Sequence, residues 1–248
     1  MQAFLIRRFW LLRQRLISTA SLVLVLPIIV FLTISIGMKS IIMETMGNIS
    51  YEEWVYPGLI MLINTIIITP IIFRDFYFLR LESQTLVTLS LSPLSKFQIV
   101  IYLIFSAIVE GVILSMISIF ILLYLMEISI GILSLIYIII AVSLFSLIIA
   151  NAFTTLSLST HRINHIFLGA SIITLFIICS SQLLIEFEFY PKSIIYIFKL
   201  LPTSMISNWY RLMVFQGEFN VDLFFIPLTI GMLWIFLNSM LMKRVLKQ

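Results

Sequence analysis

Glu110 has the most unusual setting of any ionisable residue in the sequence, because it lies near the middle of the long apolar run FSAIVEGVILSM. A carboxyl group there is costly, and it usually faces the interior of a helix bundle or a water-filled cavity. Two interpretations stay open. Glu110 either lines or gates a translocation path, or it forms hydrogen bonds at a helix or subunit contact. No second acid and no Lys or Arg lies deep in another apolar run, so a chain of proton-carrying groups is not indicated.

Two amides, Asn64 and Asn151, lie in other apolar runs and complete the candidate translocation path with Glu110. Such residues more often join helices by hydrogen bonds than line a path. Both interpretations therefore remain open for the two amides.

His161 and His165 are four residues apart in the stretch THRINH and could share one face of a helix. Two ligands alone make a weak metal site, so we expect a solvated turn and no metal. The sequence contains no G-x-S-x-G, no H-E-x-x-H and no G-x-x-x-x-G-K-[ST] motif. The chain is therefore not expected to be an enzyme, and it lacks the phosphate loop by which many proteins bind and hydrolyse ATP.

The composition identifies the solvent that the chain requires. Apolar residues make up 62% of the 248 residues and charged residues 10%, whereas soluble domains have about 45–50% and 25%. We therefore expect an all-α membrane protein, with residues 1–248 forming one transmembrane domain. A span needs about 20 apolar residues. Six stretches qualify: 16–38, 54–73, 97–126, 130–157, 166–185 and 223–242.

Basic residues are distributed unequally between the loops on the two sides of these spans. Most Lys and Arg residues fall on the side of both termini, so the positive-inside rule places both termini in the cytoplasm. The net charge of +4 is thus interpreted as a topology signal. Nucleic acid is not an expected partner.

Residues 1–15 form a basic segment before the first span. At helical spacing, one stripe carries Leu5, Phe9, Leu12 and Leu16. The other side carries Arg7, Arg8 and Arg15, with Arg13 on its flank. This pattern predicts an amphipathic helix lying in the plane of the cytoplasmic lipid headgroups. The alternative is a simple basic flank that anchors the first span.

The stretch RLESQTLVTLSLSPLSKFQIV is a polar island in the predicted cytoplasmic loop 74–96. We expect a short helix over 80–90 and a sharp turn at Ser92-Pro93, where Ser92 can cap the next helix and Pro93 can occupy its first position. A solvated connector is the alternative to a docking element. The candidate docking residues are Arg80, Glu82, Thr85, Thr88, Ser92 and Pro93.

Two apolar pieces near the end of the chain, 193–202 and 205–215, are too short to cross a bilayer. We expect them to lie at an interface or to re-enter the membrane from outside. Pro191, Pro202 and Arg211 mark this outer segment.

In their order along the chain, these features resemble the ABC-2 type permeases, the membrane subunits of bacterial ABC exporters of the type V class. The resemblance rests on the basic helix before the first span, on Glu82, Thr85 and Ser92-Pro93 before the third, and on Pro191, Leu201-Pro202 and Arg211 before the last. The stretches SYEEWVYPGL and FRDFYFLRLESQT are most similar to drug and lipo-oligosaccharide exporters. Capsule and O-antigen permeases are an alternative.

The resemblance implies a fold and a set of partners. The loop between spans two and three would be a coupling helix that enters an ATPase subunit, and the outer helices would form a re-entrant lid. Two copies of a P-loop ATPase, with ATP and Mg bound there, would join two permease copies, most simply a homodimer among membrane lipids. The location would be a bacterial or archaeal cytoplasmic membrane. The rival interpretations are a six-span carrier and a membrane anchor for an ATPase.

Overall fold

The computed structural model describes residues 2–39, 50–82, 85–128, 131–182 and 187–245, which form helices and turns with no β-strand among them. The first half contains α1 (Gln2–Gln14), α2 (Leu16–Val30), α3 (Gly37–Lys39), α4 (Tyr51–Ile72), α5 (Leu79–Leu81) and α6 (Thr85–Ser90). The second half contains α7 (Lys96–Leu125), α8 (Ile132–Ser159), α9 (Ile163–Ser180), α10 (Lys192–Lys199), α11 (Pro202–Arg211) and α12 (Val221–Val245). Three π-helical segments, η1 (Phe31–Ile36), η2 (Phe73–Phe78) and η4 (Leu212–Gln216), continue α2, α4 and α11, and Phe187–Phe189 form a 3₁₀ turn.

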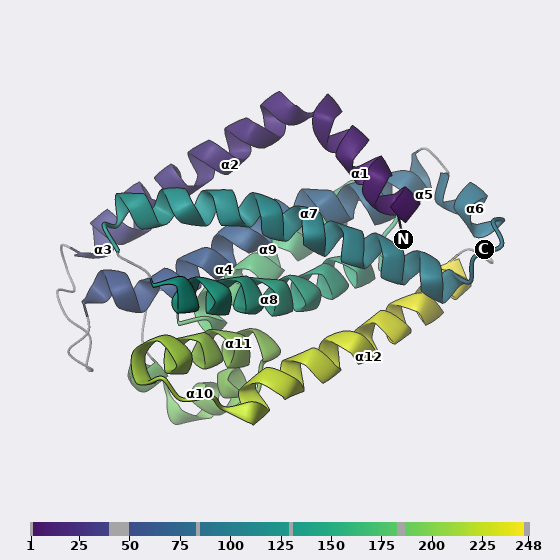
Figure 1. Cartoon of the computed structure of the whole chain (residues 1–248). Helices are drawn as coiled ribbons and strands as arrows, with labels where there is room; N and C mark the ends of the chain where they lie inside the picture. Colours follow the sequence, from purple (N-terminus) through teal and green to yellow (C-terminus); the bar gives the residue numbers. More distant parts are fainter. Residues whose placement is uncertain (1, 40–49, 83–84, 129–130, 183–186, 246–248) are drawn as a thin grey trace.

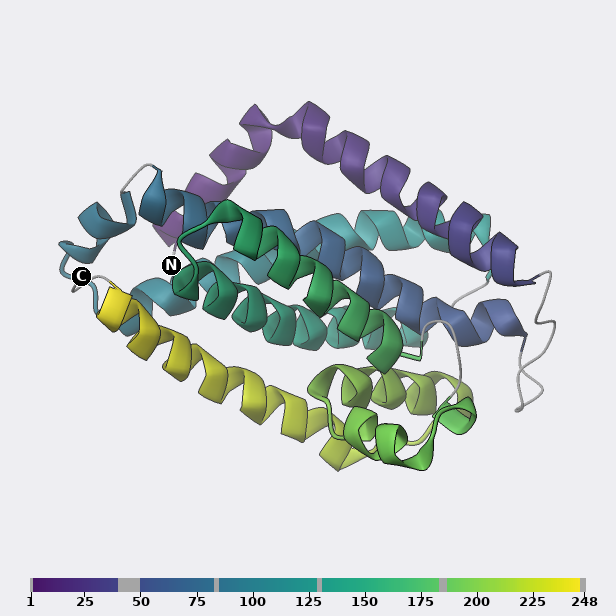
Figure 2. The same cartoon turned by 180° about the vertical axis from the view of Figure 1, so that it is seen from behind.

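Six helices are long and apolar enough to cross a membrane, as the sequence predicted: 16–36, 51–81, 96–125, 132–159, 163–180 and 221–245. α1 and the C-terminal end of α12 lie at the same end of the bundle as α5 and α6, and α10 and α11 lie at the opposite end (Figures 1 and 2). This arrangement is the one that an even number of crossings requires.

The second span is longer than the sequence indicated. We expected it to end at residue 73, but the helix continues through η2 and α5 to Leu81. Arg74 and Asp75 were interpreted as the start of a solvated loop. Instead Asp75 is fully buried, and both side chains form ion pairs inside the bundle. The π-helical segment that carries them is a kind of local distortion that is frequent at functional sites.

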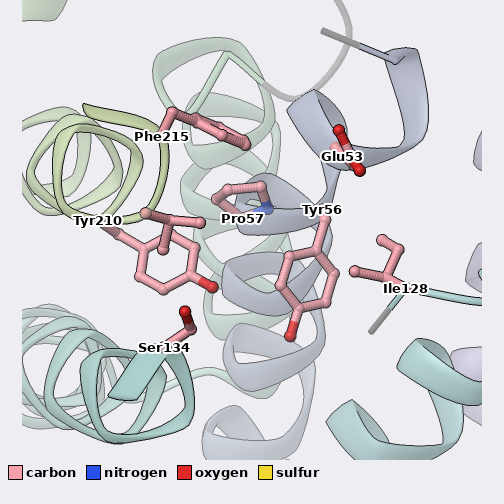
Figure 3. Close-up of a pocket in the computed structure, with 8 residues that line it drawn as sticks. Glu53, Tyr56, Pro57, Ile128, Ser134, Tyr210 and Phe215 are labelled. Atoms are coloured by element: carbon pink, nitrogen blue, oxygen red, sulfur yellow. The ribbon is translucent and has the colours of Figure 1, made fainter. Parts of the chain in front are cut away.

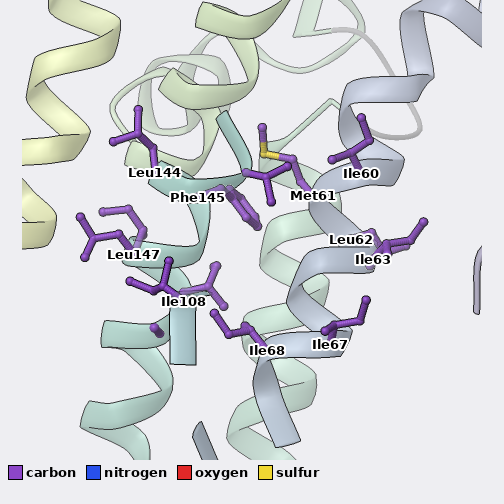
Figure 4. Close-up of a cluster of buried hydrophobic side chains, with 14 of the residues drawn as sticks. Ile60, Met61, Leu62, Ile63, Ile67, Ile68, Ile108, Leu144, Phe145 and Leu147 are labelled. Carbon is purple, nitrogen blue, oxygen red and sulfur yellow. The ribbon is translucent and has the colours of Figure 1, made fainter. Parts of the chain in front are cut away.

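The core surrounds α4. In the most apolar part of this helix 83% of the residues are buried, against 17% in α2 and in α9. Figure 4 shows isoleucines of α4 packed against Ile108 of α7 and Phe145 of α8. α4 is therefore the central helix, and α2 and α9 present most of their apolar surface to whatever surrounds the bundle.

Local sequence signals explain where several helices begin. Ser95 Oγ accepts the backbone N–H of Gln98, and Gln98 Oε1 accepts the N–H of Ser95, which together form a capping box at the start of α7. The expected cap at Ser92 and helix start at Pro93 were therefore wrong by three residues. Ser92 Oγ instead donates to Leu89 O at the end of α6, because the box at Ser95 satisfies two backbone donors at once.

The two short helices expected before the last span are present. Pro191 precedes α10 as its N-cap residue, and Pro202 occupies the first turn of α11, where a missing N–H costs nothing. α10 and α11 are joined by only two residues. They thus form a helical hairpin at the end opposite α6 (Figures 1 and 2).

Candidate functional site

A cluster of four charged side chains lies between α1, α7 and the π-helical end of α4. Arg8 Nη1 donates to Glu110 Oε2 at 2.7 Å, and Arg8 Nη2 donates to Asp75 Oδ2. The remaining Arg8 contacts are to α7: Nε donates to Ser106 Oγ at 3.2 Å and Nη2 to Leu103 O at 3.2 Å. One guanidinium group therefore fastens the first helix to two spans.

Arg74 completes the cluster. Its Nη2 donates to Glu110 Oε2 at 3.1 Å, and its Nε donates to Asp75 Oδ1 at 3.3 Å. The two carboxylates thus receive hydrogen bonds from both guanidinium groups, and the four charges balance. Such pairing is what makes buried charges tolerable.

The ionisation of Arg8 follows from opposing influences. Burial lowers the pKa of Arg8 to about 10, while the charge of Glu110 raises it and that of Arg74 lowers it. Arg8 is therefore protonated at neutral pH. Arg7, next to it, also has a pKa lowered by burial.

The expected arrangement of α1 was wrong in one respect. Arg8 was placed on the polar side of an amphipathic helix, yet it is 5% exposed, whereas Phe9 of the apolar stripe is 69% exposed. Arg7 is half-buried and Arg13 is exposed, as a basic surface requires. The physical reason is that Asp75 and Glu110 offer Arg8 two counter-ions inside the bundle, which a headgroup layer cannot match in geometry.

The expectation for Glu110 also changes. The sequence appeared to contain no basic residue that could reach it, but Arg8 and Arg74 both do. The signal that could have revealed this was present: the segment from Ile71 to Leu81 contains no Gly, Pro or Asn that would end the helix near the pair Arg74-Asp75. Which charges would meet depended on contacts between positions far apart in the chain.

Arg80 does not belong to an exposed docking surface. It is 6% exposed, and its two terminal nitrogens donate to the carbonyls of Leu158 and Thr160. Tyr77 Oη adds a hydrogen bond of 3.2 Å to His161 O. These carbonyls at the end of α8 lack partners within the helix, so Arg80 caps it.

The other predicted docking residues lie where a partner could reach them. Glu82, Thr85, Thr88 and Pro93 are exposed, and Ser92 is half-buried. The expected helix over 80–90 is shorter than predicted, because residues to Leu81 extend the second span and α6 begins at Thr85. Figures 1 and 2 show α6 projecting at the edge of the bundle.

Asn64 and Asn151 each join helices by hydrogen bonds. Asn64 accepts a hydrogen bond from Ser115 at 2.9 Å and donates to Ser146 at 2.8 Å, which links α4, α7 and α8. Asn151 accepts from Asn238 at 3.0 Å, which links α8 to α12. Both amides are fully buried. The contacts therefore support the interpretation that these two amides join helices by hydrogen bonds.

A cavity of about 230 Å³ opens at the end of the bundle where α11 lies (Figure 1). Figure 3 shows the hydroxyl groups of Tyr56, Ser134 and Tyr210 around it, with Glu53 at one side and Phe215 at another. The side chains come from α4, α8, α11 and η4. This cavity combines aromatic walls with several hydroxyl groups.

Arg211 fastens α11 beside this cavity. Its Nη1 donates to Gln182 Oε1 at 2.6 Å, its Nη2 donates to Trp54 O at 3.2 Å, and its guanidinium carbon lies 4.6 Å from the centre of the Trp54 ring. The arginine predicted to mark the outer segment therefore holds that segment onto α4 and onto the end of α9.

His161 lies in the exposed turn between α8 and α9, as expected, whereas His165 is exposed in the first turn of α9. Within the described ranges no three His, Cys, Asp or Glu residues are grouped as a metal site would require.

Comparisons with known proteins identify no relative of this chain. No protein-family model matches the chain, and no curated protein or solved structure matches it significantly. The functional argument therefore rests on the residues and their arrangement.

Proposed function

We propose that the chain is the membrane-spanning subunit of an ATP-driven exporter, with ATP hydrolysed on a separate P-loop ATPase that docks against α6. The observation that carries this proposal is the continuous helix from Tyr51 to Leu81. It runs from the cavity beside α11, through the core and past the charge cluster, and it ends at Leu81, four positions before α6 begins at Thr85. An ATPase docked near α6 would therefore lie close to the end of the helix that forms the core of the bundle.

Three features support the proposal. Glu82 and the α6 residues Thr85 and Thr88 are exposed to solvent. Arg80, five positions before α6, is fixed to the end of α8. The apolar surfaces of α2 and α9 leave room for lipid and for a second copy of this chain.

The proposed complex is a homodimer of this chain with two ATPase copies in a bacterial or archaeal cytoplasmic membrane, both termini facing the cytoplasm. The exported solute would be amphipathic: a drug, a lipid or a glycolipid. The outer cavity, with its hydroxyl groups and aromatic rings, is compatible with such a solute, and the same features leave a polysaccharide permease as an alternative.

An ion-coupled carrier is a weaker candidate. It would require Glu110 to exchange protons with solvent during transport. Glu110 accepts hydrogen bonds from two guanidinium groups inside the bundle, which suits a fixed counter-ion better than a proton carrier.

Co-purification tests the proposal. The tagged chain, extracted gently from its native membrane, should retain a P-loop ATPase in stoichiometric amount. Glu82→Lys should lose it, because a reversed charge opposes docking on that surface. Glu218→Lys is the matched control, since it reverses an exposed acid at the other end. Recovery of the ATPase with Glu82→Lys at the wild-type level, or no ATPase with the folded wild type, would refute the docking surface.

Movement of solute separates an exporter from a membrane anchor for an ATPase. Inside-out vesicles that contain the complex should accumulate an amphipathic fluorescent solute only when ATP is supplied. Vesicles that bind the ATPase and hydrolyse ATP without any such accumulation would favour the anchor.

A further inference from the structure

A second cavity lies beside the charge cluster, where α1 turns into α2. Its volume is about 140 Å³, and α2, α4 and α7 enclose it. The polar part of the lining consists of Arg15, Ser18, Thr19, Arg74 and Glu110. The apolar part consists of Leu22, Ile67, Pro70, Ile71 and Leu114. One end of the cavity is thus basic and hydroxyl-bearing, and the other is aliphatic.

The charges around this cavity do not balance. Within the cluster, Arg8 and Arg74 offset Asp75 and Glu110. Arg7 and Arg15 are close enough to repel Arg74, and neither forms an ion pair among the described residues. Of these two, Arg15 lines the cavity, so its positive charge is in excess there and a bound anion would offset it.

The depth of the cavity follows from the length of the first span. Residues 16–36 number 21, so the span is about 31 Å long at 1.5 Å per residue, close to the roughly 30 Å of the hydrocarbon core. The helix continues through α3 to Lys39, so the first span can cross the hydrocarbon core with Arg15, immediately before it, at the level of the lipid headgroups. Ser18 and Thr19 lie one turn below.

The size and surroundings of the cavity restrict its ligand. At 140 Å³ it is smaller than the roughly 300 Å³ found for drug-sized ligands, so it can take a headgroup but not a whole lipid. Acyl chains would run along the outside of α2. Leu16, Ile17 and Leu24 there are 55%, 85% and 50% exposed.

From these observations we propose that this cavity, which we call the elbow cavity, binds the phosphate-bearing headgroup of an anionic membrane lipid. Arg15 and Arg74 would donate to the phosphate oxygens, and the Ser18 hydroxyl would add a further donor. Thr19 Oγ1 already donates to Arg15 O at 2.9 Å and so helps to position the chain. The bound lipid would stabilise the turn between α1 and α2. The site does not depend on the exporter proposal.

Lipid titration of the purified chain tests this assignment. The probes are phosphatidylglycerol, phosphatidylcholine and inorganic phosphate, added to protein that has been stripped of lipid in detergent. Native mass spectrometry counts bound lipid, and thermal unfolding measures the stabilisation that binding produces. Phosphatidylglycerol should bind as one retained lipid and raise Tm, and phosphatidylcholine and phosphate should do neither.

Variants locate the binding. Arg15→Gln removes a charged donor and should weaken phosphatidylglycerol binding about tenfold or more. Arg13→Gln makes the same change two residues away on an exposed side chain outside the cavity, and its affinity should stay within about twofold. Ser18→Trp keeps all charges but fills the cavity, and it should abolish retention. Because Ser18 is exposed, the variant should fold with the wild-type Tm.

Each remaining outcome would overturn the proposal. Equal binding of phosphatidylglycerol and phosphatidylcholine would mean that the site does not recognise the net negative charge of the headgroup. Full stabilisation by inorganic phosphate would assign the cavity to a free anion. Equal losses in Arg13→Gln and Arg15→Gln would indicate a diffuse basic surface, and unchanged retention in a folded Ser18→Trp would show that the lipid binds elsewhere.

Discussion

Arg8 and Glu110 are 102 positions apart in the chain, and Arg8 Nη1 lies 2.7 Å from Glu110 Oε2. This contact changes how both residues are understood. Arg8 is a structural part of the bundle and not a headgroup anchor, and Glu110 is a counter-ion and not an isolated acid. Because both side chains are almost fully buried, neither can lose its partner without a large change in free energy.

Arg8→Ala should lower the free energy of unfolding by about 3–5 kcal/mol, because it leaves Asp75 and Glu110 with Arg74 as their only basic partner. Thermal or denaturant unfolding in detergent measures the loss. Arg13→Ala removes an exposed arginine from the same helix and should change stability by less than about 0.5 kcal/mol. Similar losses for the two variants would mean that the cluster does not stabilise the fold.

Arg8→Met and Glu110→Gln should be strongly coupled. Each single variant leaves the cluster with one unbalanced charge, whereas the double variant leaves Arg74 paired with Asp75. The double-mutant cycle should therefore give an interaction energy of about 0.5–3 kcal/mol. Additive effects on unfolding would indicate that the two side chains act independently in solution.

Glu110→Gln also distinguishes two mechanisms. If ATP drives transport, the folded variant should export solute with the pH profile of the wild type, since no proton is exchanged at this position. The comparison is made in vesicles at several pH values, after correction for the amount of folded protein. Loss of transport with a changed pH profile would favour a carrier in which Glu110 carries protons.

Arg80→Ala should change the stability of α8, whereas Glu82→Lys should change the binding of the ATPase. Arg80→Ala uncaps the end of α8 and should destabilise it by about 1.5–3 kcal/mol, which hydrogen exchange would report as faster exchange around residues 158–161. The ATPase should still co-purify with this variant. Glu82→Lys should leave the exchange unchanged and lose the ATPase. Loss of the ATPase with Arg80→Ala, together with unchanged hydrogen exchange, would indicate that Arg80 belongs to the docking surface.

Gly231→Ala should disturb the contact between α8 and α12. A Cβ atom there would lie 2.6 Å from Leu147 Cδ2 and 2.8 Å from Leu147 Cγ, and Leu147 is itself buried. We expect a cost of about 1–3 kcal/mol from overpacking. Gly37→Ala is the control, because nothing lies within 4 Å of its Cβ position. Unfolding of both variants in detergent checks the difference, and an unaffected Gly231→Ala would show that the two helices can separate slightly at no cost.

The sequence predicted the elements of this fold better than their contacts. Apolar runs of sufficient length located all six spans, and the two short outer helices were recognised because they are too short to cross. These predictions needed only local composition. The end of the second span was misplaced at residue 73, because a charged pair in a sequence reads as solvent-exposed when its partners are unknown.

The site was less predictable for the same reason. Glu110 was identified from its setting alone, but its partners come from positions 8 and 74, and no local pattern specifies which distant charges meet. Arg80 was assigned to the correct end of the protein with the wrong role, because an arginine that caps a helix and one that docks a partner look alike in sequence. Asn64 and Asn151 show the converse, since amides in apolar runs usually join helices and do so here.

The position of Arg8 has a consequence for how the protein is made. α1 is synthesised before the residues that hold Arg8 in place, which lie at positions 75 and 103–110. The partners of Arg8 therefore do not exist until η2 and α7 have been made. The docking of Arg8 between two spans must follow the synthesis of the third span.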